Sequence, residues 1–295
     1  MTLYTKSYVE VIVLYTIKDK VKMENKEQLL SHLQVVEHWE KDQKGLWFWE
    51  KVSRLPFKLL DKMTPKFIQN KMGVLLDEIG NYIQTGGKYL TQEKALLQKI
   101  QKTLPDREIA SINDVGNIPL NQMISLSEEL KSNRTKFATV QGASTGFGGI
   151  FTLAIDIPVI LGTALKTLQE IAIIHGYDPN QKEERIFIVK CLQFASADIV
   201  GKEAILNDLS AVHNDGKQAR EMISQLQGWR EVVYTYRDQF GWKKLFQMVP
   251  IVGMIFGAYT NRAMIQDISD IGMMLYRKRR ILEKLEEISN TSTNS

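Results

Sequence analysis

Apolar residues recur at every third or fourth position along most of the chain, and this spacing constrains the fold more than any other feature. Such a period places apolar side chains on one face of a helix. Alternating apolar and polar residues, typical of half-buried strands, are absent. The sequence therefore predicts a mainly α fold, a multi-helix bundle without a substantial sheet. The clearest stripes are Leu29–Leu33–Val36–Trp39, Ile68–Met72–Leu75–Ile79–Ile83, Ile186–Val189–Leu192, and Met264–Ile268–Ile271–Leu275–Leu282–Leu285.

Capping residues and prolines predict where several helices begin and end. Asn25 followed by Gln28 has the spacing of a capping box, so a helix is expected to begin there. Pro105 is expected to stop a short helix, and Pro119 to open one that runs towards Asn133.

The chain is expected to form one domain with two flanks. Met23 opens MENKEQLL like an ordinary protein start, so residues 1–22 are predicted to be an N-terminal extension or a loosely packed arm. Residues 23–288 are expected to fold as one helical domain. The last stretch, 289–295, is SNTSTNS, and this polar composition predicts a disordered tail.

Two segments break the amphipathic rule because they carry no charge. They cover residues 138–155 and 245–261, close to the ~17–25 residues that span a bilayer. Each contains a GxxxG pair, which lets another helix approach closely, so the two segments are expected to pack together. Either a buried hairpin or a hairpin entering the membrane shallowly fits this pattern. The residues are Gly142, Gly146 and Gly149 in the first segment, and Pro250, Gly253 and Gly257 in the second.

Asp156 stands between two apolar runs, with Pro158 two positions later. An uncompensated carboxylate is costly in such surroundings. One interpretation makes Asp156 a helix N-cap with Pro158 in the first turn. The other makes it an ionisable group at a membrane or a pocket.

Charge is nearly balanced overall but unevenly distributed. Lys and Arg number 38 against 34 Asp and Glu, a net charge of +4, which is too small to indicate nucleic-acid binding. The consecutive residues Arg277, Lys278, Arg279 and Arg280 are candidates for contact with anionic lipid, although such runs are also typical of a solvated face. A single cysteine, Cys191, fits a reducing compartment, so the cytoplasmic side is favoured.

Motifs for catalysis, cofactors and metals are missing. The sequence contains no HExxH, CxxC, GxSxG or Walker A motif. The run GASTGFGG lacks the strand and helix context of a dinucleotide-binding turn. His175, just before Gly176, is expected to act as a charge at a helix C-terminus. We therefore expect no catalytic residue, cofactor or metal site.

Taken jointly, these segments resemble the EcsC family over about residues 30–285. The resemblance rests on a glycine-rich turn, an Asp-x-Pro, a Gly-Tyr-Asp after a helix, and a later P-x-x-G-x-x-x-G with Asn and a basic residue. The matching positions are Gly142, Gly146, Gly149, Asp156, Pro158, Gly176, Tyr177, Asp178, Pro250, Gly253, Gly257, Asn261 and Arg277, with Trp39 and Glu40 earlier.

The resemblance implies a bacterial protein of a family named for its association with an ABC-transporter operon, and it brings no catalytic residues. We expect a non-catalytic protein on the cytoplasmic side of the membrane, peripheral or shallowly inserted. Its expected partners are the lipid surface, an ABC transporter or another membrane complex. The alternative is an enzyme or a protein that binds a small ligand or lipid, with a pocket around 142–158 and 250–262. Asp156, Asn261 and Arg262 would then meet.

Overall fold

A computed structural model describes residues 24–43, 79–86, 91–147, 150–196, 202, 205–206 and 250–293. Within these ranges all regular structure is helical and no strand occurs, which confirms the predicted mainly α fold. The helices are α2 (Lys26–Asp42), α5 (Glu93–Thr103), α6 (Ile112–Gly116), α7 (Leu120–Phe147), α8 (Ile150–Ile174), α9 (Lys182–Ser196) and α13 (Pro250–Thr293), with a short helix over 79–85.

Several helices begin and end where the sequence predicts. At the start of α2, Asn25 Oδ1 accepts from the Gln28 N–H at 2.8 Å, and Gln28 Oε1 accepts from the Asn25 N–H at 3.2 Å. This confirms the capping box, which satisfies two N–H groups that a helix leaves unpaired. The short helix α5 ends before Pro105, and α7 follows Pro119.

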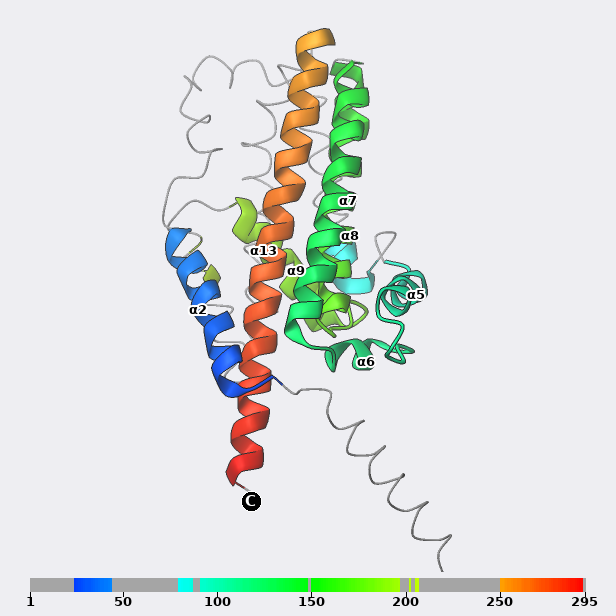
Figure 1. Cartoon of the computed structure of the whole chain (residues 1–295). Coiled ribbons are helices and arrows are strands. Elements are labelled where there is room, and N and C mark those ends of the chain that lie inside the picture. The colour runs from blue at the N-terminus through cyan, green and yellow to red at the C-terminus, as the bar shows by residue number, and fades with distance from the viewer. Residues whose placement is uncertain are drawn as a thin grey trace, which may run out of the picture.

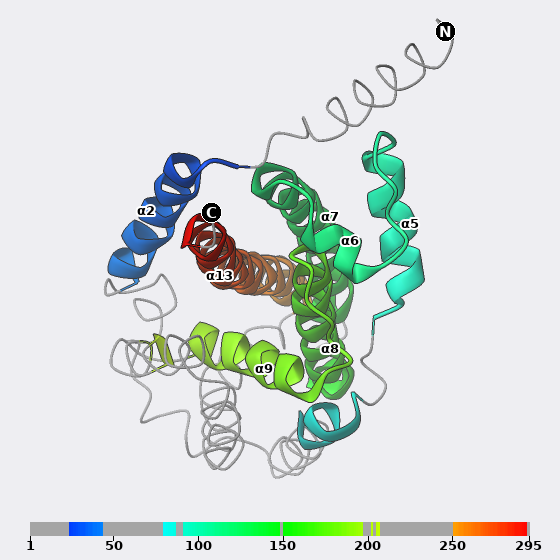
Figure 2. The same cartoon turned by 90° about the horizontal axis from the view of Figure 1, so that it is seen from below.

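The long helix α13 lies at the centre of the bundle. Seen along its axis, it is surrounded by α2, α7, α8 and α9 (Figure 2). Its 44 residues extend about 66 Å at the rise of an α-helix. Because neighbours pack around it, its buried residues do not lie on a single stripe. They include Ile265, Ile268, Ile271, Met273, Tyr276 and Ile281.

Helices α7 and α8 form an antiparallel hairpin beside α13. The colours in Figure 1 show α7 running upwards and α13 running downwards next to it. The hairpin divides the first charge-free segment, since residues up to Phe147 belong to α7 and residues from Ile150 belong to α8. What looked like one apolar stretch is therefore the meeting point of two helices.

Two boundaries differ from the predictions. Asp156 cannot be an N-cap, because α8 begins at Ile150 and continues without interruption through Pro158 to Ile174. Residues 150–155 contain no proline or glycine, so nothing among them prevents the helix from starting earlier. At the other end, α13 continues to Thr293, so most of the expected tail at 289–295 is helical.

The end of α8 brings two glycines into contact. Gly176 N–H donates to Ile173 O and Tyr177 N–H donates to Ala172 O, both at 2.9 Å, which is a Schellman motif. Gly176 has a φ of 81°, in the left-handed region that favours glycine. A Cβ built on Gly176 would lie 2.4 Å from the Gly116 Cα. A side chain at this position would therefore push α6 away from α8.

We expect Gly176→Ala to lower the free energy of unfolding by roughly 2–4 kcal/mol, from left-handed strain together with the backbone clash. Gly80→Ala is the matched control, because Gly80 lies in a helix and a Cβ there meets nothing within 4 Å. That control should stabilise by about 0.4–1 kcal/mol. Urea unfolding of the three proteins measures both effects. Equal stability of the Gly176 variant and the natural protein would contradict the close approach.

Candidate functional site

The basic residues at 277–280 do not share one face of α13. Consecutive helical residues differ by about 100° around the axis, so four of them point in four directions. Because α13 is central, each direction meets a neighbouring element. Arg277 contacts the His32 ring of α2, Lys278 Nζ donates to Glu40 Oε1 at 2.8 Å, Arg279 Nη1 donates to Glu184 Oε2 at 2.8 Å, and Arg280 Nε donates to His175 O at 2.9 Å.

Glu184 of α9 is the most deeply buried carboxylate of this network. Both of its oxygens are occupied, one by Arg279 and the other by the Tyr276 hydroxyl, which donates at 2.5 Å. Burial raises the pKa of Glu184, and the Arg279 guanidinium opposes that rise. A buried charge is tolerated only with such pairing. The arrangement holds α9 against α13 and leaves no free carboxylate oxygen for chemistry.

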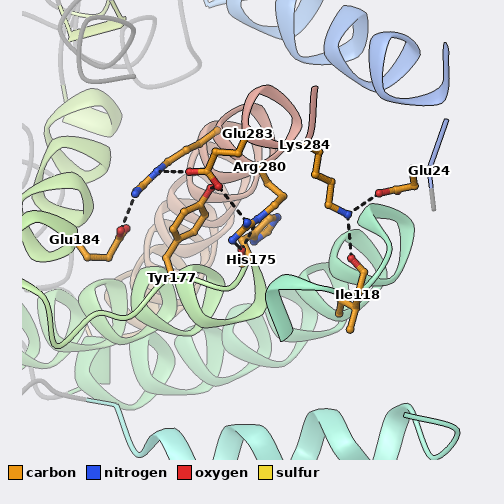
Figure 3. Close-up of polar contacts among 9 residues, drawn as sticks. Glu24, Ile118, His175, Tyr177, Glu184, Arg280, Glu283 and Lys284 are labelled. Carbon is orange, nitrogen blue, oxygen red and sulfur yellow. Dashed lines mark hydrogen bonds and ion pairs between the residues drawn. The ribbon is translucent and has the colours of Figure 1, made fainter. Parts of the chain in front are cut away.

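Tyr177 is held between charged groups of α13. Its hydroxyl donates to Glu283 Oε2 at 2.9 Å, and its ring lies under two guanidiniums, 3.9 Å from Arg279 and 4.5 Å from Arg280 to the ring centroid. Cations over an aromatic ring are attracted by its quadrupole. Figure 3 shows Tyr177, Arg280 and Glu283 converging on the end of α8. The loop after α8 is thus fixed to α13 by its tyrosine.

His175 is buried beside this cluster and is uncharged. Its Nδ1 lies 2.8 Å from Ile171 O, so this nitrogen carries the proton and donates. Burial lowers the pKa of His175 to about 4. The expectation that His175 serves as a charge at the helix C-terminus is therefore wrong. Arg280 takes that role from another helix, since it binds the His175 carbonyl and a cation there complements the helix dipole.

Lys284 extends the network to the first described residues. Its Nζ donates to Glu24 Oε2 at 2.7 Å and to Ile118 O at 3.2 Å. The other Glu24 oxygen accepts from the Leu120 N–H at 2.7 Å, which satisfies one of the unpaired donors at the start of α7. Figure 3 shows Lys284 between Glu24 and Ile118. One lysine therefore joins α13, the entry to α2 and the entry to α7.

A second region of interest is the end of the bundle where the charge-free segments meet. The C-terminal part of α7 and the beginning of α13 lie side by side at the top of Figure 1. Large apolar side chains on three helices are exposed near this end. They are Phe137 (52% exposed) and Val140 (69%) on α7, Val159 (40%) on α8, and Tyr259 (49%) on α13. We call the region formed by 137–147, 150–159 and 250–261 the apolar end.

The register of α7 and α13 bears on the expected glycine packing. Lys131 Nζ lies 2.5 Å from Asp270 Oδ1, which fixes the antiparallel pairing. Gly142 comes eleven residues after Lys131, and Gly257 comes thirteen residues before Asp270. These two glycines are therefore nearly level, and the same holds for Gly146 and Gly253. Gly142 is buried. The register is compatible with face-to-face glycines, whose contact stays a prediction.

The structure gives the positions of some, but not all, of the other expected site residues. Asn261 is 1% exposed, whereas the next residue, Arg262, is exposed, so the two do not share surroundings. The backbones of Asp156 and Pro158 lie within α8, Pro250 is the first residue of α13, and Gly149 lies outside the described residues. A pocket joining Asp156, Asn261 and Arg262 stays a prediction. No group of side chains suited to a metal ion occurs in the described ranges.

None of the described helices is both long enough and apolar enough to cross a bilayer.

Comparison with known proteins decides the family. The sequence model of the EcsC protein family matches residues 31–281. The chain belongs to the EcsC family. It is 58% identical over 264 residues to the "Uncharacterized protein YdbA" of Bacillus subtilis (strain 168), covering 90% of this chain and 97% of YdbA. It is 23% identical over 235 residues to "Protein EcsC" of the same strain, covering 79% and 94% of the two chains. No solved structure matches it.

Sequence reasoning missed residues of this EcsC-family chain in both regions. Glu184 and Glu283 were not singled out from the sequence, because nothing local marks a partner on another helix. The exposed Phe137, Val140 and Tyr259 have no distinguishing neighbours in sequence either. A stronger signal was present at Gly176-Tyr177-Asp178, which belongs to the family pattern and proved to be the loop that α13 holds.

The neutral state of His175 predicts how stability depends on pH. In the unfolded chain its pKa is near 6.5, and in the folded chain it is about 4. The unfolded state therefore binds the extra proton between these values, and the free energy of unfolding falls by up to about 3 kcal/mol as the pH drops through this window. This contribution is fully present above pH 6.5.

The variant His175→Gln cannot titrate there and keeps a donor for the Ile171 carbonyl. Urea unfolding between pH 7 and pH 4 should give a shallower loss of stability for the variant than for the natural protein. Parallel curves for the two proteins would rule out a neutral buried imidazole as the source.

Proposed function

We propose that this EcsC-family protein is a non-catalytic, peripheral membrane protein that docks on the cytoplasmic face of the cell membrane through its apolar end. The observation that carries the proposal is that α7, α8 and α13, which contact one another, each expose large apolar side chains in or beside their charge-free stretches. Single exposed apolar residues are ordinary, but a group on adjacent helices is typical of an interaction site.

The dimensions of the apolar end favour shallow insertion. From Phe137 to Phe147, α7 extends about 16 Å, roughly half of the ~30 Å hydrocarbon core. In α8 only Ile150–Ile155 precede Asp156, a length of about 9 Å. An ionised carboxylate is costly within the hydrocarbon, so Asp156 limits the depth. The apolar end is thus sized for one leaflet.

The buried polar network supports a structural role rather than a catalytic one. The polar atoms of Glu184, Tyr177 and Arg280 form hydrogen bonds with other parts of the same chain. Their contacts hold α8 and α9 to α13, far along that helix from the apolar end. In this proposal the network keeps α8 in register with α13, and the Lys131–Asp270 pair does the same for α7. An accessory role beside an ABC transporter or another membrane complex stays a prediction from the family resemblance.

Flotation with lipid vesicles tests the proposal. We expect the natural protein to float with vesicles, and the triple variant Phe137→Ser, Val140→Ser, Tyr259→Ser to bind at least about 10-fold more weakly, since each change removes apolar area that would enter the lipid.

The variant Leu30→Ser, Val35→Ser is the matched control. These residues are also exposed, at 40% and 48%, but they lie on α2, beside the part of α13 remote from the apolar end (Figure 1). The control should float like the natural protein. Failure of the natural protein to float, or an equal loss in the control, would refute docking through the apolar end.

A further inference from the structure

We propose that Lys136, Lys166 and Arg262 form a basic belt at the base of the apolar end, and that this belt selects membranes rich in anionic phospholipid headgroups. The inference rests on the proposed function and deepens it by naming the lipid class. It also moves the lipid-binding cations away from residues 277–280, where the sequence alone had suggested them.

Each belt residue is the first basic residue on its helix after the charge-free stretch. Lys136 directly precedes the exposed Phe137 on α7, Lys166 follows Asp156 on α8, and Arg262 follows Asn261 on α13. On α7 and α13 a cation directly adjoins the apolar end, whereas on α8 Asp156 comes first and Lys166 follows seven residues beyond Val159. The long side chains of such cations can extend to the headgroups when the tip of the apolar end, as far as Asp156, enters the hydrocarbon.

Ion pairs between the helices place the three cations at similar heights along the bundle. The Lys131–Asp270 ion pair marks one level on α7 and α13. From that level, Lys136 lies five residues beyond Lys131 towards the apolar end, and Arg262 lies eight residues beyond Asp270 in the same direction. The Arg134–Glu170 ion pair marks a level on α7 and α8. From that level, Lys136 lies two residues beyond Arg134 towards the apolar end, and Lys166 lies four residues beyond Glu170. These pairs give offsets of three and two residues, and counting from Phe147 and Ile150 gives an offset of five for Lys166, so the three cations lie within about two turns of one another.

The belt cations are available to an external anion. Lys136 and Arg262 are exposed and Lys166 is partly exposed. Their side chains form no ion pair or hydrogen bond with any residue in the described ranges. Two carboxylates on these helices, Asp270 and Glu170, are already paired with Lys131 and Arg134. By contrast, Arg277, Lys278, Arg279 and Arg280 are each engaged within the chain.

Charge complementarity identifies the occupant as an anionic lipid surface. A zwitterionic headgroup offers no net attraction to three cations, whereas an anionic leaflet attracts each basic residue near it, enough to change binding roughly 5-fold per residue. The apolar side chains beside the belt distinguish this surface from one suited to a soluble anion. The geometry thus combines hydrophobic insertion with recognition of headgroup charge.

The test compares two kinds of vesicle, phosphatidylcholine alone and phosphatidylcholine mixed with phosphatidylglycerol. Binding isotherms are measured for the full chain and for Lys136→Gln, Arg262→Gln and the triple variant with Lys166→Gln. We expect the natural protein to prefer the mixed vesicles, each single variant to lose roughly 5-fold on them, and the triple variant to lose most of the preference. Binding to phosphatidylcholine alone should stay unchanged. Raising the salt should reduce the preference by screening.

The double variant Lys94→Gln, Lys102→Gln is the matched control for net charge. Both lysines are exposed on α5, which lies on the outside of the bundle (Figure 2). This control should keep the preference for mixed vesicles. Equal circular dichroism spectra and melting temperatures would show that all variants fold, which is expected because they change solvent-facing groups.

Three outcomes would refute the proposal that the basic belt selects anionic membranes. The natural protein binds both kinds of vesicle equally, the triple variant keeps the preference, or the α5 control loses it as the triple variant does. Each of these leaves docking through the apolar end intact. Failure to bind either kind of vesicle would instead refute the proposed function, and the belt with it.

Discussion

The structure depends on the pairing of charges around its central helix. A helix enclosed by neighbours is usually apolar on all sides, yet α13 carries Arg277, Lys278, Arg279, Arg280 and Lys284 within two turns. Removing such groups from water is costly unless each gains a partner. The partners come from α2, α8, α9 and the entries to α2 and α7. Rotating α13 by one residue would misplace every contact, so the pairs specify its rotation and register.

The helices were largely predictable because their causes are local. The stripe from Leu29 to Trp39, the capping box of Asn25 and Gln28 and the stop near Pro105 each act within a few residues. The hairpin of α7 and α8 was less visible, because its glycine-rich turn also fits the GxxxG pattern of a continuous packed helix. The same cause misplaced Asp156, whose neighbours allow the helix to start six residues earlier.

The candidate sites were less predictable because they depend on elements far apart in the sequence. The run at 277–280 has the composition of a solvated face, and only the surrounding helices turn it inward. Conversely, Lys136, Lys166 and Arg262 look unremarkable in sequence, and they reach similar levels only through the antiparallel registers that Lys131–Asp270 and Arg134–Glu170 define. The family pattern did indicate Tyr177, although spacing alone gave no reason for two guanidiniums to meet its ring.

The central position of α13 has a consequence for biosynthesis. In chain order α13 follows every other described helix, so a ribosome delivers the centre of the bundle after its surroundings. Until then the faces of α7, α8 and α9 that α13 covers have no partner, and Glu184 lacks its arginine. Long-range pairing of this kind delays native packing until the late segment arrives. The emerging chain therefore presents apolar helices before the segment that encloses them, a period in which chaperone binding would be most useful.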